Sequence, residues 1–331
     1  MDKELKNIFL FHSGKLSDKW MFYLNEWDAI FSPYKKSKID LLEIGIQNGG
    51  SLEVWAKYFN YANHILGCDI NETCLELEYE DPRISVVVGN ANSDEVKKKI
   101  FSIATDFDII IDDGSHKSGD IITSFTKYFP KVSMNGIYLI EDLHASYWKD
   151  FEGGLYEPYS ALSFLKRLAD VINFEHWRTN KSREQHLLPF FTKYNTHMDE
   201  IDLCSINSIK FLNSMCVIYK QQPDQNKLGQ RVVVGSEEKI TNNCKRYNRS
   251  DIHDIAFSIQ EKDEMDIFLL IEKLSLLKTG EEQLKKEIND LKKNVKNLEE
   301  EIKIFKNSKS WKLTKPFRKF IGIFRGKPES R

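Results

Sequence analysis

Short apolar runs alternate with amphipathic stretches over the first 220 residues, and this alternation predicts an α/β fold. Runs typical of buried parallel strands occupy residues 39–45, 64–70, 84–90, 107–111 and 136–140. Helical patterns begin near residue 51 and span 94–103, 118–129 and 158–172. Strands and helices in this order predict a doubly wound parallel sheet with right-handed crossovers. Residues 208–212 and 215–219, separated by Asn213-Ser214, predict a closing antiparallel hairpin, and 173–205 is predicted to be irregular.

Two amphipathic helices are predicted outside this alternation. Residues 20–31 place apolar side chains on one helix face, which either packs on the edge of the domain or covers a bound ligand. From Ile267 the apolar period becomes 3.5, with Leu at every d position up to Leu298 and mostly β-branched residues at a. This pattern favours a parallel two-stranded coiled coil, and therefore a homo-oligomer. The alternative is a long helix that packs on its own domain.

The chain therefore divides into an N-terminal helical segment (1–37), an α/β domain (38–221), a polar linker (222–265), a coiled coil (266–306) and a tail (307–331). The 331 residues leave room for a domain of this size and a smaller unit. Five cysteines without C-x-x-C spacing indicate a reducing cytoplasm and no zinc site. Neither an apolar run of membrane-spanning length nor a signal peptide is recognisable, so we expect a cytoplasmic protein.

The tail reverses the charge of the chain. Residues 307–331 hold eight Lys/Arg against Glu329, a charge of +7, although the net charge of the whole chain is −2. On a helix after Pro316, four apolar residues would share one face, opposite the cations: Phe317, Phe320, Ile321 and Phe324. This pattern predicts peripheral binding to an anionic membrane surface. A solvated tail or an RNA contact is the alternative, and we do not expect a nucleic-acid partner.

Polar side chains follow two predicted strands at the point where each ends. Asp112, Asp113 and His116 follow the run 107–111, and Glu141-Asp142 follows 136–140, with His144 two residues further on. Open α/β sheets place their chemistry at the C-terminal ends of their strands. These carboxylates and imidazoles are therefore expected at one edge of the sheet.

The turn after the first strand also predicts a ligand site. Glu43 precedes Gly45, and Gly49-Gly50 precede a helix, so the backbone can approach a ligand closely. The pattern is not G-x-G-x-x-G, which disfavours a dinucleotide, and the acid suits a ligand that carries an amine or hydroxyls. Asp69 lies 24 residues beyond Gly45, the spacing expected of a carboxylate that accepts hydrogen bonds from a ribose.

These motifs resemble the class I S-adenosylmethionine-dependent methyltransferases, which have a Rossmann-like sheet. Residues 30–220 resemble more specifically the metal-dependent sugar O-methyltransferases typified by mycinamicin methyltransferase, which share sequence with proteins labelled cephalosporin hydroxylases. The segments that carry the resemblance are 42–52, 111–116 and 139–148. The spacing between the last two is part of it: Glu141 follows Asp113 by 28 positions.

The resemblance implies a site, a cofactor and a metal. Asp113, Glu141 and Asp142 would hold Mg²⁺, and His116 would be the general base. S-adenosyl-L-methionine would be bound by Glu43, Gly45, Gln47, Gly49, Asp69, Asn90 and Asp112. Asn90 departs from the family, which commonly has an acid there, so the adenine contact is in question. The acceptor would be a sugar or glycan, in the biosynthesis of a surface polysaccharide or a glycoside.

The residues themselves are consistent with this chemistry. A hard cation held by carboxylates can bind vicinal hydroxyls and lower their pKa, and an imidazole can then accept the proton. His144 could orient a ligand, contact the substrate or pack beside Trp148.

Two other functions fit parts of the pattern. His116 and His144 with one carboxylate could form the facial triad of a non-haem iron hydroxylase, although such an enzyme has no use for a ribose-binding acid. Alternatively, a non-catalytic methyltransferase-like head could be displayed by the coiled coil as an assembly protein.

Overall fold

The computed structural model describes residues 4–252, 267–316 and 318. The chain divides into two compact units, Met1–Glu261 and Lys262–Arg331. Residues 253–265 of the predicted linker, residue 266 of the predicted coiled coil and the four apolar positions of the tail lie outside the described residues.

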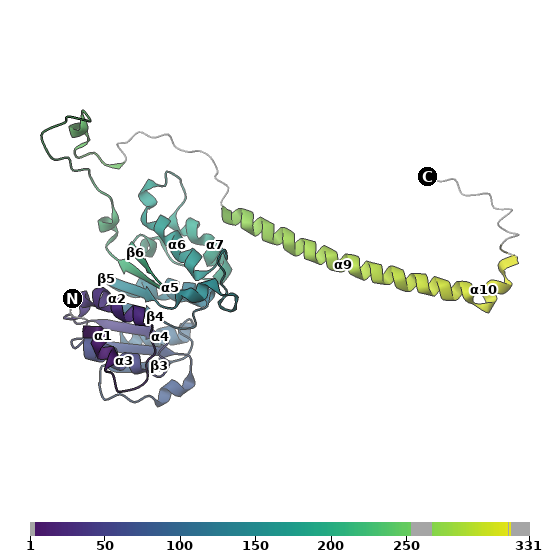
Figure 1. Ribbon diagram of the computed structural model, residues 1–331, viewed down its shortest axis with the longest axis horizontal. Coiled ribbons are helices and arrows are strands. Elements are labelled where there is room, and N and C mark those ends of the chain that lie inside the picture. Colours follow the sequence, from purple (N-terminus) through teal and green to yellow (C-terminus); the bar gives the residue numbers. More distant parts are fainter. Residues whose placement is uncertain (1–3, 253–266, 317, 319–331) are drawn as a thin grey trace. The chain divides into compact units, whose positions relative to one another are not determined.

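The first unit contains a seven-stranded sheet (Figure 1). Its strands are β1 (Asp40–Ile44), β2 (His64–Asp69), β3 (Ile84–Val88), β4 (Phe107–Asp112), β5 (Val132–Ile140), β6 (Ile206–Leu212) and β7 (Met215–Lys220). The order is β3-β2-β1-β4-β5-β7-β6; the first five strands are parallel, and β7 runs antiparallel to β5 and β6. The predicted α/β fold with a Rossmann-like sheet is confirmed. The chain reverses its winding direction between β1 and β4, the point at which open α/β sheets bind ligands.

Helices cover both faces of this sheet. Buried residues of α1 (Glu4–Leu10), α2 (Met21–Phe31) and α3 (Gly50–Tyr58) form one cluster with Ile137 and Leu139 of β5. Tyr138 points to the opposite face, because side chains alternate along a strand. There it contacts Phe125 of α5 (Ser118–Tyr128), which contacts Phe164 of α6 (Ala161–Ile172). On this side, Phe101 of α4 (Asp94–Ile103) contacts Tyr128 of α5.

The predicted helix at 20–31 is α2, and it packs on the sheet through an aromatic cluster. Trp27 is fully buried, with ring centroids 4.8 Å from Trp55 of α3 and 6.2 Å from Phe31. Burying each large apolar side chain contributes about 2 kcal/mol before the loss of conformational entropy. A buried indole also needs an acceptor for its N–H group. Both tryptophans find one at the C-terminal edge of the sheet.

The prediction that 173–205 is irregular was wrong. This segment contains η6 (Phe174–His176), α7 (Arg183–Tyr194) and α8 (Glu200–Leu203). A capping box between Ser182 and Gln185 begins α7, whose apolar face is buried. Pro189 lies inside α7 and obscured the helical pattern, because proline normally ends a helix. The remaining 3₁₀ turns are η1 (Ser32–Tyr34), η2 (Glu72–Glu76), η3 (Phe129–Lys131), η4 (Leu143–Tyr147), η5 (Lys149–Phe151), η7 (Pro223–Asn226) and η8 (Cys244–Tyr247).

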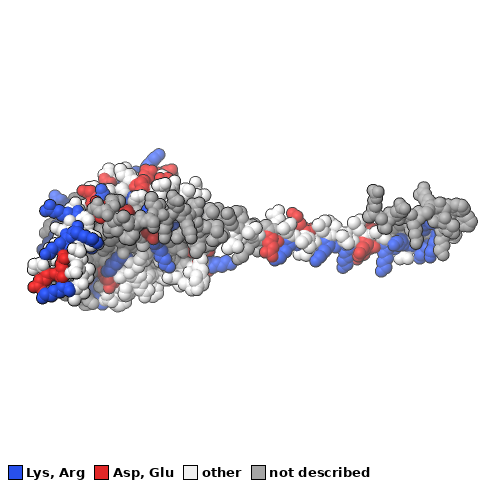
Figure 2. All heavy atoms as spheres, turned by 90° about the horizontal axis from the view of Figure 1, so that it is seen from above, with Lys and Arg blue, Asp and Glu red and all other residues white. Residues whose placement is uncertain are grey.

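The second unit consists of α9 (Ile267–Asn307) and α10 (Lys309–Leu313). Basic and acidic side chains lie along α9, with uncharged ones between them (Figure 2). The apolar heptad positions from Leu284 to Phe305 are exposed, for example Leu291 at 63%. A partner for this apolar seam stays a prediction. Among the described residues, no helix combines the length and the apolarity needed to cross a membrane.

Replacing Gly45 with alanine should destabilise the first unit. Gly45 has a φ of +87°, and an added Cβ would lie 2.2 Å from the carbonyl oxygen of Asp113. Left-handed backbone and overpacking together should cost about 3 kcal/mol, measured by urea unfolding. Gly154→Ala is the matched control, because its Cβ would approach other atoms to no less than 3.4 Å. Equal stability of the two variants would contradict the close approach of the β1 turn to the end of β4.

Candidate functional site

The C-terminal edge of the sheet borders a cavity of about 510 Å³. Residues at or directly after the ends of β1, β2, β3 and β4 line this cavity. Asp142, two residues after the end of β5, lines it as well. Six of the seven predicted cofactor residues line the cavity: Glu43, Gly45, Gln47, Asp69, Asn90 and Asp112. Gly49 does not. It precedes α3 with a φ of +78°, and an added Cβ would lie 2.1 Å from the hydroxyl oxygen of Tyr79.

Asp69 fixes the turn that follows β1. Its Oδ2 accepts hydrogen bonds from the backbone N–H groups of Ile46 (2.9 Å) and Gln47 (3.0 Å), and its Oδ1 accepts one from Asn71. Each carboxylate oxygen can accept more than one hydrogen bond. Asp69 can therefore brace the turn and also accept from a ligand in the cavity.

Glu43 is fully buried and has one oxygen without a hydrogen-bond partner. Its Oε2 accepts from the Ser51 hydroxyl (2.6 Å) and from the Trp55 indole (3.0 Å), whereas its Oε1 accepts from no group. Burial raises the pKa of Glu43, and the nearby Lys19 ammonium opposes that rise. A buried acceptor without a donor is costly, so the Oε1 atom fits a ligand that carries a hydrogen-bond donor.

Asp112 closes the same cavity from the end of β4. It is buried, and its Oδ2 accepts a hydrogen bond from the Tyr138 hydroxyl at 2.9 Å. Burial raises the pKa of Asp112 to about 7, although the Tyr138 hydrogen bond opposes the rise.

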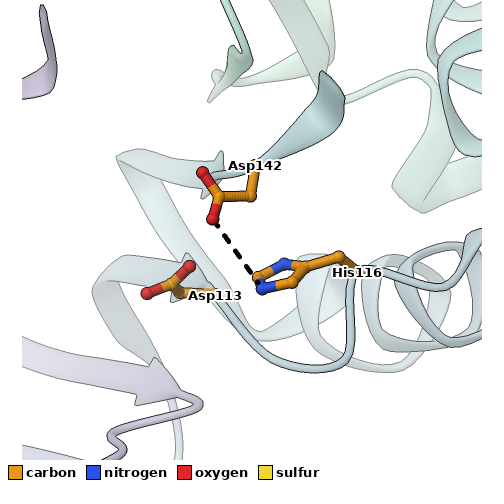
Figure 3. A group of neighbouring side chains, drawn as sticks. All are labelled: Asp113, His116 and Asp142. Atoms are coloured by element: carbon orange, nitrogen blue, oxygen red, sulfur yellow. Dashed lines mark ion pairs between the residues drawn. The ribbon is translucent and has the colours of Figure 1, made fainter. Parts of the chain in front are cut away.

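Asp113, His116 and Asp142 converge beside the cavity (Figure 3). One potential ligand atom from each lies within 4.8 Å of the others, and His116 Nε2 is 3.9 Å from Asp142 Oδ2. His116 and Asp142 both have left-handed backbone, with φ of 56° and 53°. Such strained conformations cluster at functional sites. The donor set, two carboxylates and an imidazole, is suited to a divalent cation.

Asp142 is held in place by Tyr23 of α2 and by Trp20, the residue directly before α2. Its Oδ1 accepts hydrogen bonds from the Tyr23 hydroxyl (2.7 Å) and the Trp20 indole (3.0 Å). The other oxygen is thereby left to face His116.

Lys19 is the main residue of the site that the sequence did not indicate. Its ammonium contacts Asp113 Oδ2, lies 2.7 Å from Glu141 Oε2 and lies 3.6 Å from Glu43 Oε1. Its side chain is only 5% exposed. Burial alone would lower the pKa of Lys19, but the three carboxylates outweigh it and the pKa is raised. The sequence placed Lys19 just before an aromatic helix, and no periodicity indicates where such a side chain points.

Glu141 is fully buried among donors from the N-terminal segment. Its Oε1 accepts from the Trp27 indole at 3.2 Å, and its Oε2 accepts from Lys19. Burial raises the pKa of Glu141, and the charge of Lys19 opposes the rise. The structure thus brings Asp113 and Asp142 together with His116, and pairs Glu141 with Lys19.

Comparisons with known proteins identify sugar O-methyltransferases. No protein-family model matches the chain. A demethylmacrocin O-methyltransferase from Streptomyces fradiae is 34% identical over 185 residues, covering 52% of this chain and 46% of that protein. A mycinamicin VI 2''-O-methyltransferase from Micromonospora griseorubida is 32% identical over 173 residues, covering 49% and 42%. An 8-demethyl-8-α-L-rhamnosyl tetracenomycin-C 2'-O-methyltransferase from Streptomyces olivaceus is 30% identical over 177 residues, covering 50% and 46%. The chain thus spans less than half the length of these relatives.

Solved structures lead to the same family. The MycE methyltransferase of mycinamycin biosynthesis, in complex with Mg, SAH and mycinamycin VI, has a TM-score of 0.51 and 26% identity, covering 67% of this chain and 55% of that one. A second crystal form with Mg and SAH has a TM-score of 0.54, covering 71% and 57%. The resemblance to class I methyltransferases, and to sugar O-methyltransferases among them, is confirmed.

Replacing Lys19 with methionine should strongly destabilise the protein. Glu43 and Glu141 would stay fully buried and Asp113 partly buried, and all three would lose the cation that they share. Removing one partner of a buried charge group costs about 3–5 kcal/mol, and urea unfolding at neutral pH would measure it. Lys15→Met is the control, because Lys15 and Glu53 are both partly exposed, and such a pair is worth about 1 kcal/mol at most. If the two variants were equally stable, Lys19 would not neutralise these carboxylates.

Proposed function

We propose that this chain is an S-adenosylmethionine- and Mg²⁺-dependent O-methyltransferase that acts on a sugar hydroxyl. The observation that carries the proposal is that Asp113, His116 and Asp142 converge on the cavity that six predicted cofactor residues line. The similarity to sugar O-methyltransferases, and to a structure that holds Mg and SAH, supports it.

The cavity provides groups that match the cofactor. Asp69 would present a carboxylate to ribose hydroxyls, and Oε1 of Glu43, which accepts no hydrogen bond in the structure, could accept one from the amino group of the methionine part. Gly45 allows the backbone to approach closely, because any larger residue would meet the Asp113 carbonyl.

We propose that carboxylates bind the metal ion and that His116 accepts the proton of the sugar hydroxyl. As the resemblance implies, Asp113 and Asp142 would be ligands and His116 the general base, because a ring nitrogen that binds an ion cannot also accept a proton. A divalent cation held there would lower the pKa of a bound sugar hydroxyl. His116 would take the hydroxyl proton on Nε2, the ring nitrogen that faces Asp142. Lys19 contacts both Asp113 and the third predicted ligand, Glu141, so an ion bound by these carboxylates would compete with the Lys19 ammonium.

The iron hydroxylase alternative is not favoured. His144 directs Nδ1 to the Ser214 hydroxyl, and the metal-compatible group that contains His116 does not include it. The curated relatives are O-methyltransferases.

The second unit suggests how the enzyme associates with a second copy and with a membrane. We propose that α9 pairs with a second copy as a parallel coiled coil through its exposed a and d positions, from Leu284 to Phe305. Glu287 and Glu301 would face Lys292 and Lys306 of the other helix. The basic tail would hold the enzyme on the cytoplasmic face of a membrane, where it would methylate a surface glycan or another glycoside.

Substituting His116 should abolish methyl transfer and leave the cofactor bound. His116→Ala removes the proton acceptor, which contributes about 10²–10⁴-fold to the rate, and Asp113→Asn should lower activity by weakening Mg²⁺ binding. Transfer from labelled S-adenosylmethionine to a panel of nucleotide sugars and glycosides, with Mg²⁺ or EDTA, would measure both effects.

The control for these variants is His197→Gln, which alters a surface histidine paired with Asp199. Calorimetry with S-adenosylhomocysteine should give wild-type affinity for His116→Ala. Undiminished methylation by His116→Ala or Asp113→Asn would refute the assigned roles and leave the fold unaffected.

Charged substitutions in the α9 seam should dissociate the oligomer. Leu284→Glu with Leu291→Glu places like charges at two d positions, and sedimentation should show a shift from dimer to monomer. Lys286→Glu with Lys293→Glu, on the outer face of the coil, should leave the dimer intact. A wild-type chain that sediments as a monomer would rule out the coiled coil.

A further inference from the structure

Three aromatic side chains form an exposed surface next to Asp142. The ring of Trp20 lies 5.9 Å from that of His144 in an edge-to-face arrangement, and His144 lies 4.8 Å from Trp148. Trp20 is 59% exposed and Trp148 is 51% exposed. This cluster, which we call the Trp20–Trp148 surface, combines the segment before α2 with η4 and the residue that follows it.

We propose that the Trp20–Trp148 surface binds the acceptor sugar ring. The proposal rests on the proposed function and adds the part of the site that holds the substrate. A tryptophan that served only packing would bury its faces, whereas both indoles keep about half of their surface in solvent.

The surface adjoins the reactive group through Trp20. The Trp20 indole N–H donates to Asp142 Oδ1 at 3.0 Å, and Asp142 belongs to the group with Asp113 and His116. A molecule resting on these rings would therefore have its edge next to His116 and the two carboxylates. The sugar ring would then rest on the aromatic surface while one of its hydroxyls lay near His116. Methyl transfer to a ring hydroxyl requires this placement.

Hydrogen bonds orient two side chains of the surface, Trp20 and His144. His144 Nδ1 bonds to the Ser214 hydroxyl, which also bonds to Tyr23. Tyr23 in turn donates to Asp142. Because these contacts order Trp20 and His144 before a ligand arrives, binding loses little entropy at these two side chains.

A sugar ring has the chemistry that this surface can recognise. One face of a hexose or deoxyhexose carries C–H groups, which pack on an aromatic ring, and its edge carries hydroxyls, which donate to carboxylates. The rings themselves carry no fixed charge, so a neutral glycoside suits them. The aromatic surface extends to Phe151, 5.9 Å from Trp148, where a further ring of the acceptor could lie.

Trp148 gives the sharpest test, because the contacts found for its ring are to His144 and Phe151 and not to Asp113, His116 or Asp142. The probe is methyl α-L-rhamnopyranoside, added to the full chain with Mg²⁺ and S-adenosylhomocysteine. Saturation-transfer NMR should show contact between aromatic protons and the sugar C–H groups. Trp148→Ala should weaken probe binding roughly tenfold, Trp148→Phe should restore most of it, and the KM for an acceptor should rise with kcat changed by less than about threefold.

Trp177→Ala is the matched control, since Trp177 is a partly exposed tryptophan whose ring contacts those of Phe174 and His186. It should bind the probe as the wild type does. Wild-type probe binding by Trp148→Ala, or no saturation transfer to the probe in the wild type, would overturn the proposal. So would a Trp148→Ala chain whose only defect is a change in sedimentation, which would make the surface a contact between copies. Failure of the proposed function would appear separately, as a lack of S-adenosylhomocysteine binding by calorimetry.

Discussion

Three carboxylates, of which Glu43 and Glu141 are fully buried and Asp113 is partly buried, share one ammonium group, and the organisation of the site depends on that arrangement. Glu43, Asp113 and Glu141 lie at the ends of β1, β4 and β5, which are adjacent in the sheet. Isolated buried charges are too costly to keep, so the strand ends need a cation and hydrogen-bond donors. Lys19 provides the cation, and the indoles of Trp55 and Trp27 donate to Glu43 and Glu141. The segment before α2 is therefore part of the site as well as part of the fold.

The same contacts stabilise the fold and position the side chains of the proposed site. Trp27 packs in the aromatic core with one side of its ring system and donates to Glu141 with its N–H. Tyr23 is nearly fully buried and directs its hydroxyl to Asp142. Such coupling keeps the reactive side chains in position, because a packed core resists small displacements. A cation recruited to Glu141 would compete with Lys19, so metal binding and the position of the N-terminal segment are linked in the proposed enzyme.

Much of the fold could be predicted from local patterns. Each parallel strand is a short apolar run between polar turns. Polar residues directly after two of these runs indicated which edge of the sheet carries Asp113, His116 and Asp142. The helix α7 could not be predicted, because Pro189 interrupts its pattern and the capping box that begins it is a local signal inside an otherwise irregular stretch. The partner of the α9 seam also stays a prediction.

The sequence by itself determined the α/β class, the order of the strands along the chain and the residue types at the edge of the sheet, because these depend on periodicity and on chain direction. Only the tertiary structure decided how the side chains pair. Lys19 is more than 90 residues from Asp113 and more than 120 from Glu141, and Trp20 is equally far from Asp142. No local pattern encodes contacts across such separations. They arise because α2 packs across the sheet and brings the residues before it to the strand ends.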